Sequence, residues 1–265
     1  MALPTDHPPL PLFHRDLGGA GEPPIVLLHG LLGSSRNWQT VGRELAATRR
    51  VFALDLRNHG QSPHDPDVSY PAMAADVAAW LDAQGLGAAE LVGHSMGGKV
   101  AMLIACRDPA RVARLVVVDI APKDYDWPAH RGEFRGMNAL DLGALASRAQ
   151  AEAQLEATVP DWAMRKFLTT NLDRTAEGGW RWLVNLPALT AGLAAIEGNA
   201  LAAADRFDGP TLFLAGGHSG YIKAADHELI RAHFPLARIE TIAGSGHNPH
   251  IEAREAFVAA VNRRP

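Results

Sequence analysis

Residues 91–98 read Leu-Val-Gly-His-Ser-Met-Gly-Gly, a short apolar run that leads into Gly-x-Ser-x-Gly. A stretch that favours a helix, residues 99–107, follows directly. A strand, a turn of small residues and a helix form a nucleophile elbow, in which Ser95 sits on a strained turn with its hydroxyl above the sheet. Gly93 and Gly97 lack a Cβ, so strand and helix can approach closely there. We therefore predict that Ser95 is a nucleophile and that the helix dipole is directed at the reacting centre.

The composition predicts one large domain, or one domain with an insertion. The chain has 265 residues, of which 47% are hydrophobic and 20% charged, enough apolar sequence for a substantial core. The net charge of −4 gives no electrostatic case for nucleic acid or anionic membranes. Cys106 is the single cysteine, and residues 1–9 lack the features of a secretory signal. With no run long enough to span a membrane, we expect a cytoplasmic protein without nucleic-acid or membrane partners. The oligomeric state is left open.

Buried strand patterns alternate with helical patterns through most of the chain. Continuous apolar runs of this kind are typical of strands that are buried on both faces of a parallel sheet. The runs are residues 25–28, 51–55, 89–93, 115–120, 211–215 and 238–243. Their alternation with helical segments argues for βαβ units and a mostly parallel sheet flanked by helices.

The alternation stops in one internal region. Residues 123–206 read as helix after helix with no buried strand pattern, and four of the six tryptophans fall there. We therefore predict a core domain of residues 1–122 and 207–265, with residues 123–206 inserted as a helical cap. Aromatic side chains in a cap suggest an apolar underside over a ligand. Trp162 and Trp182 are the predicted substrate contacts, and the alternative for either is packing of the cap onto the core.

A serine hydroxyl is a poor nucleophile until a base takes its proton. His247 follows the last predicted strand, in the small-residue loop Gly-Ser-Gly-His, and comes after the serine in chain order as this arrangement requires. His29 and His94 each precede a turn, which favours structural roles, and His94 is also a candidate substrate contact. The other loop histidines are assigned to surface or packing roles: His59, His64, His218 and His250. No cysteine and histidine spacing predicts a zinc site, and no metal is expected.

The developing oxyanion needs two N–H donors aimed at it. One is predicted to be the N–H of Met96, the residue after the nucleophile. The other is predicted to come from Leu31, in the loop that follows the strand at residues 25–28. Because both donors are backbone groups, the side chains of Leu31, Leu32 and Met96 remain free to form an apolar wall of the acyl site.

Several stretches together resemble a known superfamily. They are residues 29–34, 55–60, 93–99, 118–122 and 244–247. The chain resembles the α/β-hydrolase fold superfamily and, within it, the bacterial YbfF-like esterases and their mitochondrial relatives. Residues 57–60, Arg-Asn-His-Gly, are more particular to this branch, because many relatives have Arg-Gly-His-Gly. The resemblance implies hydrolysis of acyl esters through a serine–histidine–acid triad without a cofactor.

The acid of this triad departs from the usual pattern. Most superfamily members carry it in a Gly-x-x-Asp turn after the strand that here is residues 211–215, where this chain has Ser219. Serine cannot stabilise an imidazolium as a carboxylate does. Asp119 ends the strand after the nucleophile helix, a second position from which a carboxylate reaches the same histidine, and the resemblance to YbfF-like enzymes implies its use. We favour Asp119 over Asp226, the nearest downstream alternative.

The predicted activity is that of a serine carboxylesterase acting on a small-molecule ester with a short to medium acyl chain. Ser95, His247 and Asp119 form the predicted triad. Thioester hydrolysis, carbon–carbon bond hydrolysis and cofactor-free perhydrolysis can use the same three groups and remain alternatives. A non-catalytic binding member of the fold is expected to have a damaged triad, whereas this chain retains all three candidates.

Overall fold

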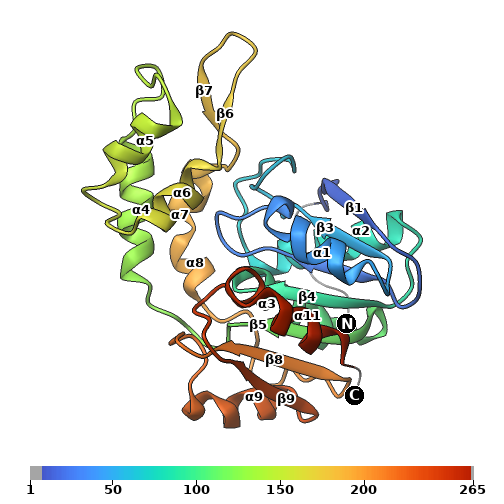
Figure 1. Ribbon diagram of the computed structural model, residues 1–265. Helices are drawn as coiled ribbons and strands as arrows, with labels where there is room; N and C mark the ends of the chain where they lie inside the picture. The colour runs from blue at the N-terminus through green and yellow to red at the C-terminus, as the bar shows by residue number, and fades with distance from the viewer. Residues whose placement is uncertain (1–7, 264–265) are drawn as a thin grey trace.

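A seven-stranded sheet forms the centre of the molecule, and the computed structural model describes residues 8–263. The strand order is β1-β3-β2-β4-β5-β8-β9 (Figure 1). β1 (His14–Gly18) runs antiparallel to β3 (Val51–Leu54), and every other neighbouring pair is parallel. The remaining strands are β2 (Ile25–Leu28), β4 (Ala89–His94), β5 (Val112–Val118), β8 (Thr211–Gly216) and β9 (Ala237–Ile242). The predicted α/β sheet is confirmed.

Helices cover both faces of this sheet, which explains why its strands read as continuous apolar runs. α1 (Gln39–Leu45) and α11 (Arg254–Asn262) pack on one face. α2 (Tyr70–Ala83), α3 (Met96–Arg107) and α9 (His227–His233) cover the other. Short helices complete the core: η1 (Ser35–Trp38), η2 (Pro109–Arg111), η3 (Ala224–Asp226) and α10 (Pro249–Glu252).

The chain between β5 and β8 carries the elements of the predicted cap, to one side of the sheet (Figure 1). Its helices are α4 (Pro128–Ala139), α5 (Arg148–Leu155), α6 (Trp162–Thr169), α7 (Leu186–Ala191) and α8 (Leu193–Glu197). The expectation of helices alone is wrong, because β6 (Leu172–Arg174) and β7 (Trp180–Trp182) pair as an antiparallel hairpin. These strands are three residues long and mostly half-buried or exposed, so they lack the buried-strand pattern.

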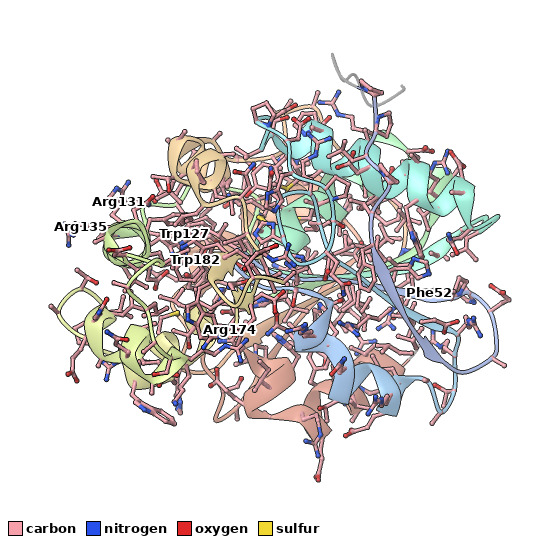
Figure 2. The ribbon with its side chains drawn as sticks, turned by 90° about the horizontal axis from the view of Figure 1, so that it is seen from above. Phe52, Trp127, Arg131, Arg135, Arg174 and Trp182 are labelled. Carbon is pink, nitrogen blue, oxygen red and sulfur yellow. The ribbon has the colours of Figure 1, made fainter. Side chains whose placement is uncertain are left out.

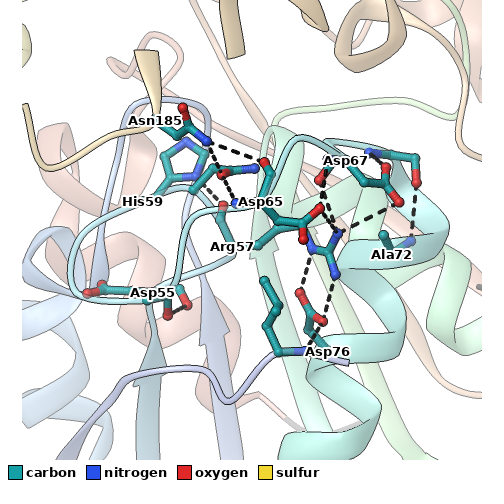
Figure 3. A network of polar contacts seen from close by, with 12 residues as sticks. Asp55, Arg57, His59, Asp65, Asp67, Ala72, Asp76 and Asn185 are labelled. Atoms are coloured by element: carbon teal, nitrogen blue, oxygen red, sulfur yellow. Dashed lines mark hydrogen bonds and ion pairs between the residues drawn. The ribbon is translucent and has the colours of Figure 1, made fainter. Parts of the chain in front are cut away.

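The loop after β3 ties the core to the cap (Figure 3). Arg57 makes a two-pronged ion pair with Asp76 on α2, with Nε to Oδ2 at 2.6 Å and Nη2 to Oδ1 at 2.9 Å. The next residue, Asn58, accepts hydrogen bonds from the backbone N–H and from the side-chain amide of Asn185, each at 2.9 Å. Asn185 caps the N-terminus of α7. The loop therefore fixes the cap to the body of the sheet at a point near the carboxyl ends of the strands.

A second tie comes from the nucleophile helix itself. Lys99 on α3 is fully buried, and its Nζ donates to the carbonyl oxygens of Glu197 and Gly198, at the end of α8, at 3.0 and 2.5 Å. The ammonium also lies 5.0 Å from the ring centroid of Tyr125 and 5.6 Å from that of Trp127. Burial nevertheless lowers the pKa of Lys99 to about 7, because the apolar surroundings disfavour the charged form.

We expect Lys99→Met to remove a pH-dependent part of the stability between pH 7 and pH 9. In the unfolded chain the amine keeps its proton up to about pH 10.5, whereas in the folded protein it loses the proton near pH 7. The unfolded state therefore binds more protons in this interval. The free energy of unfolding should rise with pH by at most about 1.4 kcal/mol per unit from this group. Urea denaturation at both pH values measures the difference between wild type and variant, with the half-exposed Lys166→Met as control. Equal pH dependence in wild type and Lys99→Met would contradict the expectation.

Candidate active site

Ser95 lies on the sharp turn between β4 and α3. Its φ of 51° and ψ of −118° are in a region that non-glycine residues rarely occupy, as the strained turn of a nucleophile elbow requires. A Cβ on Gly93 would approach the Gly97 carbonyl oxygen to 2.3 Å, and one on Gly97 would approach the Leu28 carbonyl oxygen to 2.5 Å. The start of α3 can lie this close to β4 and β2 only because both positions are glycine.

Asp119 and His247 are brought together at the carboxyl end of the sheet. The His247 Nδ1–H donates to Asp119 Oδ2 at 2.8 Å. Asp119 is fully buried, and its Oδ1 accepts from the Gly216 N–H at 2.9 Å. The Ser219 hydroxyl donates to Oδ2 of the same carboxylate. Ser219, which stands where most superfamily members have the acid, therefore contacts the carboxylate that takes its place.

The alternative acid, Asp226, is engaged elsewhere. Lys123 Nζ lies 2.7 Å from each of its carboxylate oxygens, and the Lys223 N–H donates to it at 2.8 Å. Burial acts to raise the pKa of Asp226, but these hydrogen bonds outweigh it and lower the pKa overall. Of the two candidate acids, Asp119 is the one hydrogen-bonded to His247.

Tyr221 and His94 hold His247 in place, the first through the His247 ring and the second through the His247 backbone. Tyr221 stacks on it with 3.7 Å between ring centroids and 16° between the planes. The His94 Nε2–H donates to the His247 carbonyl oxygen at 2.8 Å, and burial lowers the pKa of His94 well below its ordinary value. Because Nδ1 of His247 is bound to Asp119, Nε2 is its remaining nitrogen. Within residues 8–263 Ser95 Oγ makes no hydrogen bond to it, and such bonds are often long before substrate binds.

The two predicted oxyanion donors flank Ser95. A Cβ on Gly30 would lie 3.2 Å from Ser95 Cβ, so the loop that carries Leu31 runs directly against the nucleophile. Met96 begins α3, where the first backbone N–H groups have no partner inside the helix. In the described part of the chain neither the Leu31 N–H nor the Met96 N–H is hydrogen-bonded.

Two buried histidines hold this loop in place. His59 Nε2 accepts from the Leu32 N–H at 3.2 Å, and His29 Nε2 accepts from the Leu56 N–H at 3.0 Å. Each Nδ1–H donates to a nearby backbone carbonyl. Burial lowers the pKa of both rings, that of His59 to about 3, so both are neutral acceptors at pH 7. The assignment of His59 to a surface or packing role missed this hydrogen bond, for which the Arg-Asn-His-Gly motif was the available signal.

The remaining loop histidines divide into two kinds. His250 is buried against the rings of Trp38 and His94, at 4.4 and 4.7 Å between centroids, and burial lowers its pKa to about 3. His64 and His218 have their side chains at the surface. All three agree with the surface or packing roles that the sequence suggests.

A cavity of about 510 Å³ lies between core and cap, and Ser95 is one of the residues that line it. This volume is within the range of about 300–1,000 Å³ that is usual for small-molecule sites. Among the core residues that line it are Leu31, Leu32, His94, Ser95 and His247. Its cap lining comes from α4, α6 and the residue before α6: His130, Glu133, Asp161, Ala163, Met164 and Phe167.

The two cap tryptophans predicted as substrate contacts do not line this cavity. The Trp162 side chain is 64% exposed and lies 5.4 Å from Lys166 Nζ. Trp182 packs on the apolar cluster beneath the β6–β7 hairpin, and Figure 2 shows it together with Trp127 on the cap side of the molecule. The apolar roof comes instead from residues of α6, spaced three and four apart on one helix face. They are Ala163, Met164 and Phe167.

Within residues 8–263, no group of three or more histidine, cysteine, aspartate or glutamate side chains is arranged to hold a metal ion. In the same part of the chain, every helix is too short or too polar to cross a membrane.

Comparisons with known proteins show the family of the chain. The family described as the α/β hydrolase fold matches residues 23–254. The mouse sn-1-specific diacylglycerol lipase ABHD11 is 41% identical, over 97% of this chain and 86% of that protein. The esterase YbfF of Escherichia coli (strain K12) is 38% identical, over 91% of this chain and 92% of its own. A solved marine microorganism esterase superposes with a TM-score of 0.92 at 35% identity, covering 95% of this chain and 98% of that one. The chain therefore belongs to the α/β hydrolase fold family, and it is similar to esterases and to a lipase of that family.

Proposed function

We propose that this protein is a serine carboxylesterase that hydrolyses short- to medium-chain acyl esters through Ser95, His247 and Asp119. The observation that carries the proposal is the 2.8 Å hydrogen bond from His247 Nδ1 to Asp119 Oδ2, beside a cavity that Ser95 and His247 both line. A carboxylate in this position holds the imidazole in the tautomer whose Nε2 can accept a proton, and it stabilises the imidazolium that forms.

The proposed reaction proceeds through an acyl-enzyme. Ser95 Oγ attacks the ester carbonyl carbon while His247 Nε2 takes the hydroxyl proton. The carbonyl oxygen becomes negative, and the N–H groups of Leu31 and Met96 donate to it. His247 then returns the proton to the leaving alcohol as the acyl-enzyme forms. A water molecule, deprotonated by His247, attacks the acyl-enzyme and releases the carboxylic acid.

The acyl chain occupies the apolar part of the cavity. Leu31 and Leu32 line it from the core, and Met164 and Phe167 line it from α6. The side chain of His94 completes this wall next to the nucleophile. Because the cap closes over the cavity of about 510 Å³, the space for the chain is limited.

A series of p-nitrophenyl esters with acyl chains from two to sixteen carbons tests this proposal. We expect kcat/KM to be greatest for chains of four to eight carbons. At sixteen carbons it should be lower by about tenfold or more, because a mismatch of only about 1.4 kcal/mol with the cap already has that effect. A maximum at sixteen carbons would contradict the proposed chain length. Failure to hydrolyse any member of the series would contradict the proposed activity.

A further inference from the structure

A second polar pair lines the catalytic cavity, on its cap side. His130 and Glu133 extend from α4, three residues apart, and the His130 Nδ1–H donates to Glu133 Oε2 at 2.6 Å. Glu133 is only 5% exposed, although it lines the cavity. Among residues 8–263, no other side chain or backbone donor reaches its carboxylate. The reaction proposed above uses neither side chain.

The pair offers a hydrogen-bond acceptor to whatever fills the cavity. A carboxylate oxygen accepts, so Nδ1 of His130 carries the proton in the bond to Glu133. The other carboxylate oxygen, Oε1 of Glu133, remains as an acceptor. An acceptor that loses water without gaining a donor is costly, so an apolar ligand at this position would bind poorly. A ligand that brings a donor satisfies the pair.

Ring contacts place the pair on the side of the cavity that holds His247. The rings of His130 and Trp127 are 5.0 Å apart between centroids, and those of Trp127 and Tyr221 are 5.7 Å apart. Tyr221 in turn stacks on His247. In acyl transfer the histidine gives a proton to the leaving group, so the alcohol part of an ester lies beside His247. The acceptor pair therefore faces the alcohol rather than the acyl chain.

The charges around the cavity limit which alcohol part of an ester can bind there. Three carboxylates line it, those of Glu133, Asp161 and Glu252, and no lysine or arginine among residues 8–263 does. Asp161 and Glu252 already accept hydrogen bonds from backbone N–H groups, at 2.6 to 3.0 Å. A phosphate or carboxylate on the alcohol would meet like charge here. An uncharged hydroxyl would meet an acceptor.

We propose that Glu133, oriented by His130, determines specificity by binding a free hydroxyl of the leaving alcohol. Esters whose alcohol part carries a free, uncharged hydroxyl are then favoured over esters whose alcohol part has none. This inference rests on the proposed function and specifies the alcohol part of its substrate. It gives His130 a positioning role and makes Glu133 the residue that contacts the substrate.

The test compares two butyrate esters that differ in the hydroxyls of the alcohol, glycerol monobutyrate and propyl butyrate, by titration of the released acid. The readout is the ratio of their kcat/KM values. We expect wild type to favour the glycerol ester by about tenfold or more, the size typical of a hydrogen bond to a charged group. Glu133→Gln should bring this ratio to within about threefold of one. A loss of activity that is common to both esters cancels in the ratio. Glu177→Gln, a matched change at an exposed position near the tip of the β6–β7 hairpin, should keep the wild-type ratio.

The outcomes separate this inference from the function on which it rests. A wild-type ratio near one, or a ratio that Glu133→Gln leaves at the wild-type value, overturns the inference while ester hydrolysis stands. Hydrolysis of neither butyrate nor any p-nitrophenyl ester overturns the proposed function itself. Should Glu133→Gln fail to fold, as judged by circular dichroism, His130→Gln examines the same pair. A fall of at least about threefold in its ratio is then expected, and an unchanged ratio overturns the inference.

Discussion

Ser95→Ala is expected to abolish ester hydrolysis, with kcat for p-nitrophenyl butyrate lowered by on the order of 10⁴- to 10⁶-fold. Alanine keeps the backbone of the elbow but removes the oxygen that attacks the carbonyl, so no acyl-enzyme can form. The oxyanion donors and the cavity remain, and the small residual rate should come from them. Initial rates of p-nitrophenol release measure the effect.

Ser147→Ala provides the matched control for this variant. The Ser147 side chain accepts a hydrogen bond at the N-terminus of α5, and Ser147 does not line the cavity. The control should retain activity close to wild type, and both variants should keep the wild-type far-ultraviolet circular dichroism. Activity of Ser95→Ala within about tenfold of wild type would remove Ser95 from the chemistry, because even one lost transition-state contact has an effect of that size.

Asp119→Asn is expected to lower kcat by about 10⁴-fold with little change in KM, the size of effect seen when the triad acid of a serine protease is replaced by its amide. The reason lies in the contacts of the two carboxylate oxygens. Oδ1 accepts from the Gly216 backbone N–H, a donor that cannot rotate. The amide oxygen of asparagine should take that place, so its NH₂ group would face His247. The imidazole would then accept at Nδ1 and carry its proton on Nε2, where it cannot take one from Ser95.

Asp226→Asn is the matched control for the acid. Its carboxylate is bound to Lys123 and is not hydrogen-bonded to His247. We expect kcat within about threefold of wild type, because a change outside the reacting groups removes no transition-state contact. A large loss of kcat in Asp226→Asn with a small loss in Asp119→Asn would reverse the assignment of the acid.

The elements that could be predicted from the sequence depend on local pattern. The buried strands are continuous apolar runs, and the elbow is a strand, a set of glycines and a helix in direct succession. The pairing of His247 with Asp119 could be anticipated because the carboxyl ends of neighbouring parallel strands meet at one edge of the sheet. The absence of an acid at Ser219 then made Asp119 the better candidate.

The cap was harder to predict, because tertiary packing rather than local pattern decides which of its side chains face the cavity. Trp162 is a large aromatic residue that the structure leaves exposed, whereas Met164 and Phe167 on the same helix line the cavity. The helical spacing of the latter two was the better signal. The short strands of the hairpin and the His130–Glu133 pair carry no sequence signature of their own. The hairpin depends on the pairing of two segments, and the position of the His130–Glu133 pair at the cavity depends on how α4 packs in the fold.

The central claim, that Ser95, His247 and Asp119 act as one unit, is tested most directly by the rate at which a fluorophosphonate labels the protein. Mass spectrometry of peptides locates the adduct, and the time course gives the rate in wild type, His247→Gln and Asp119→Asn. We predict a single adduct on Ser95 in wild type, with labelling slower by at least about 10³-fold in both variants, because the residual reactivity without a triad member is low. An adduct at another residue, or equal rates in all three proteins, would contradict the account.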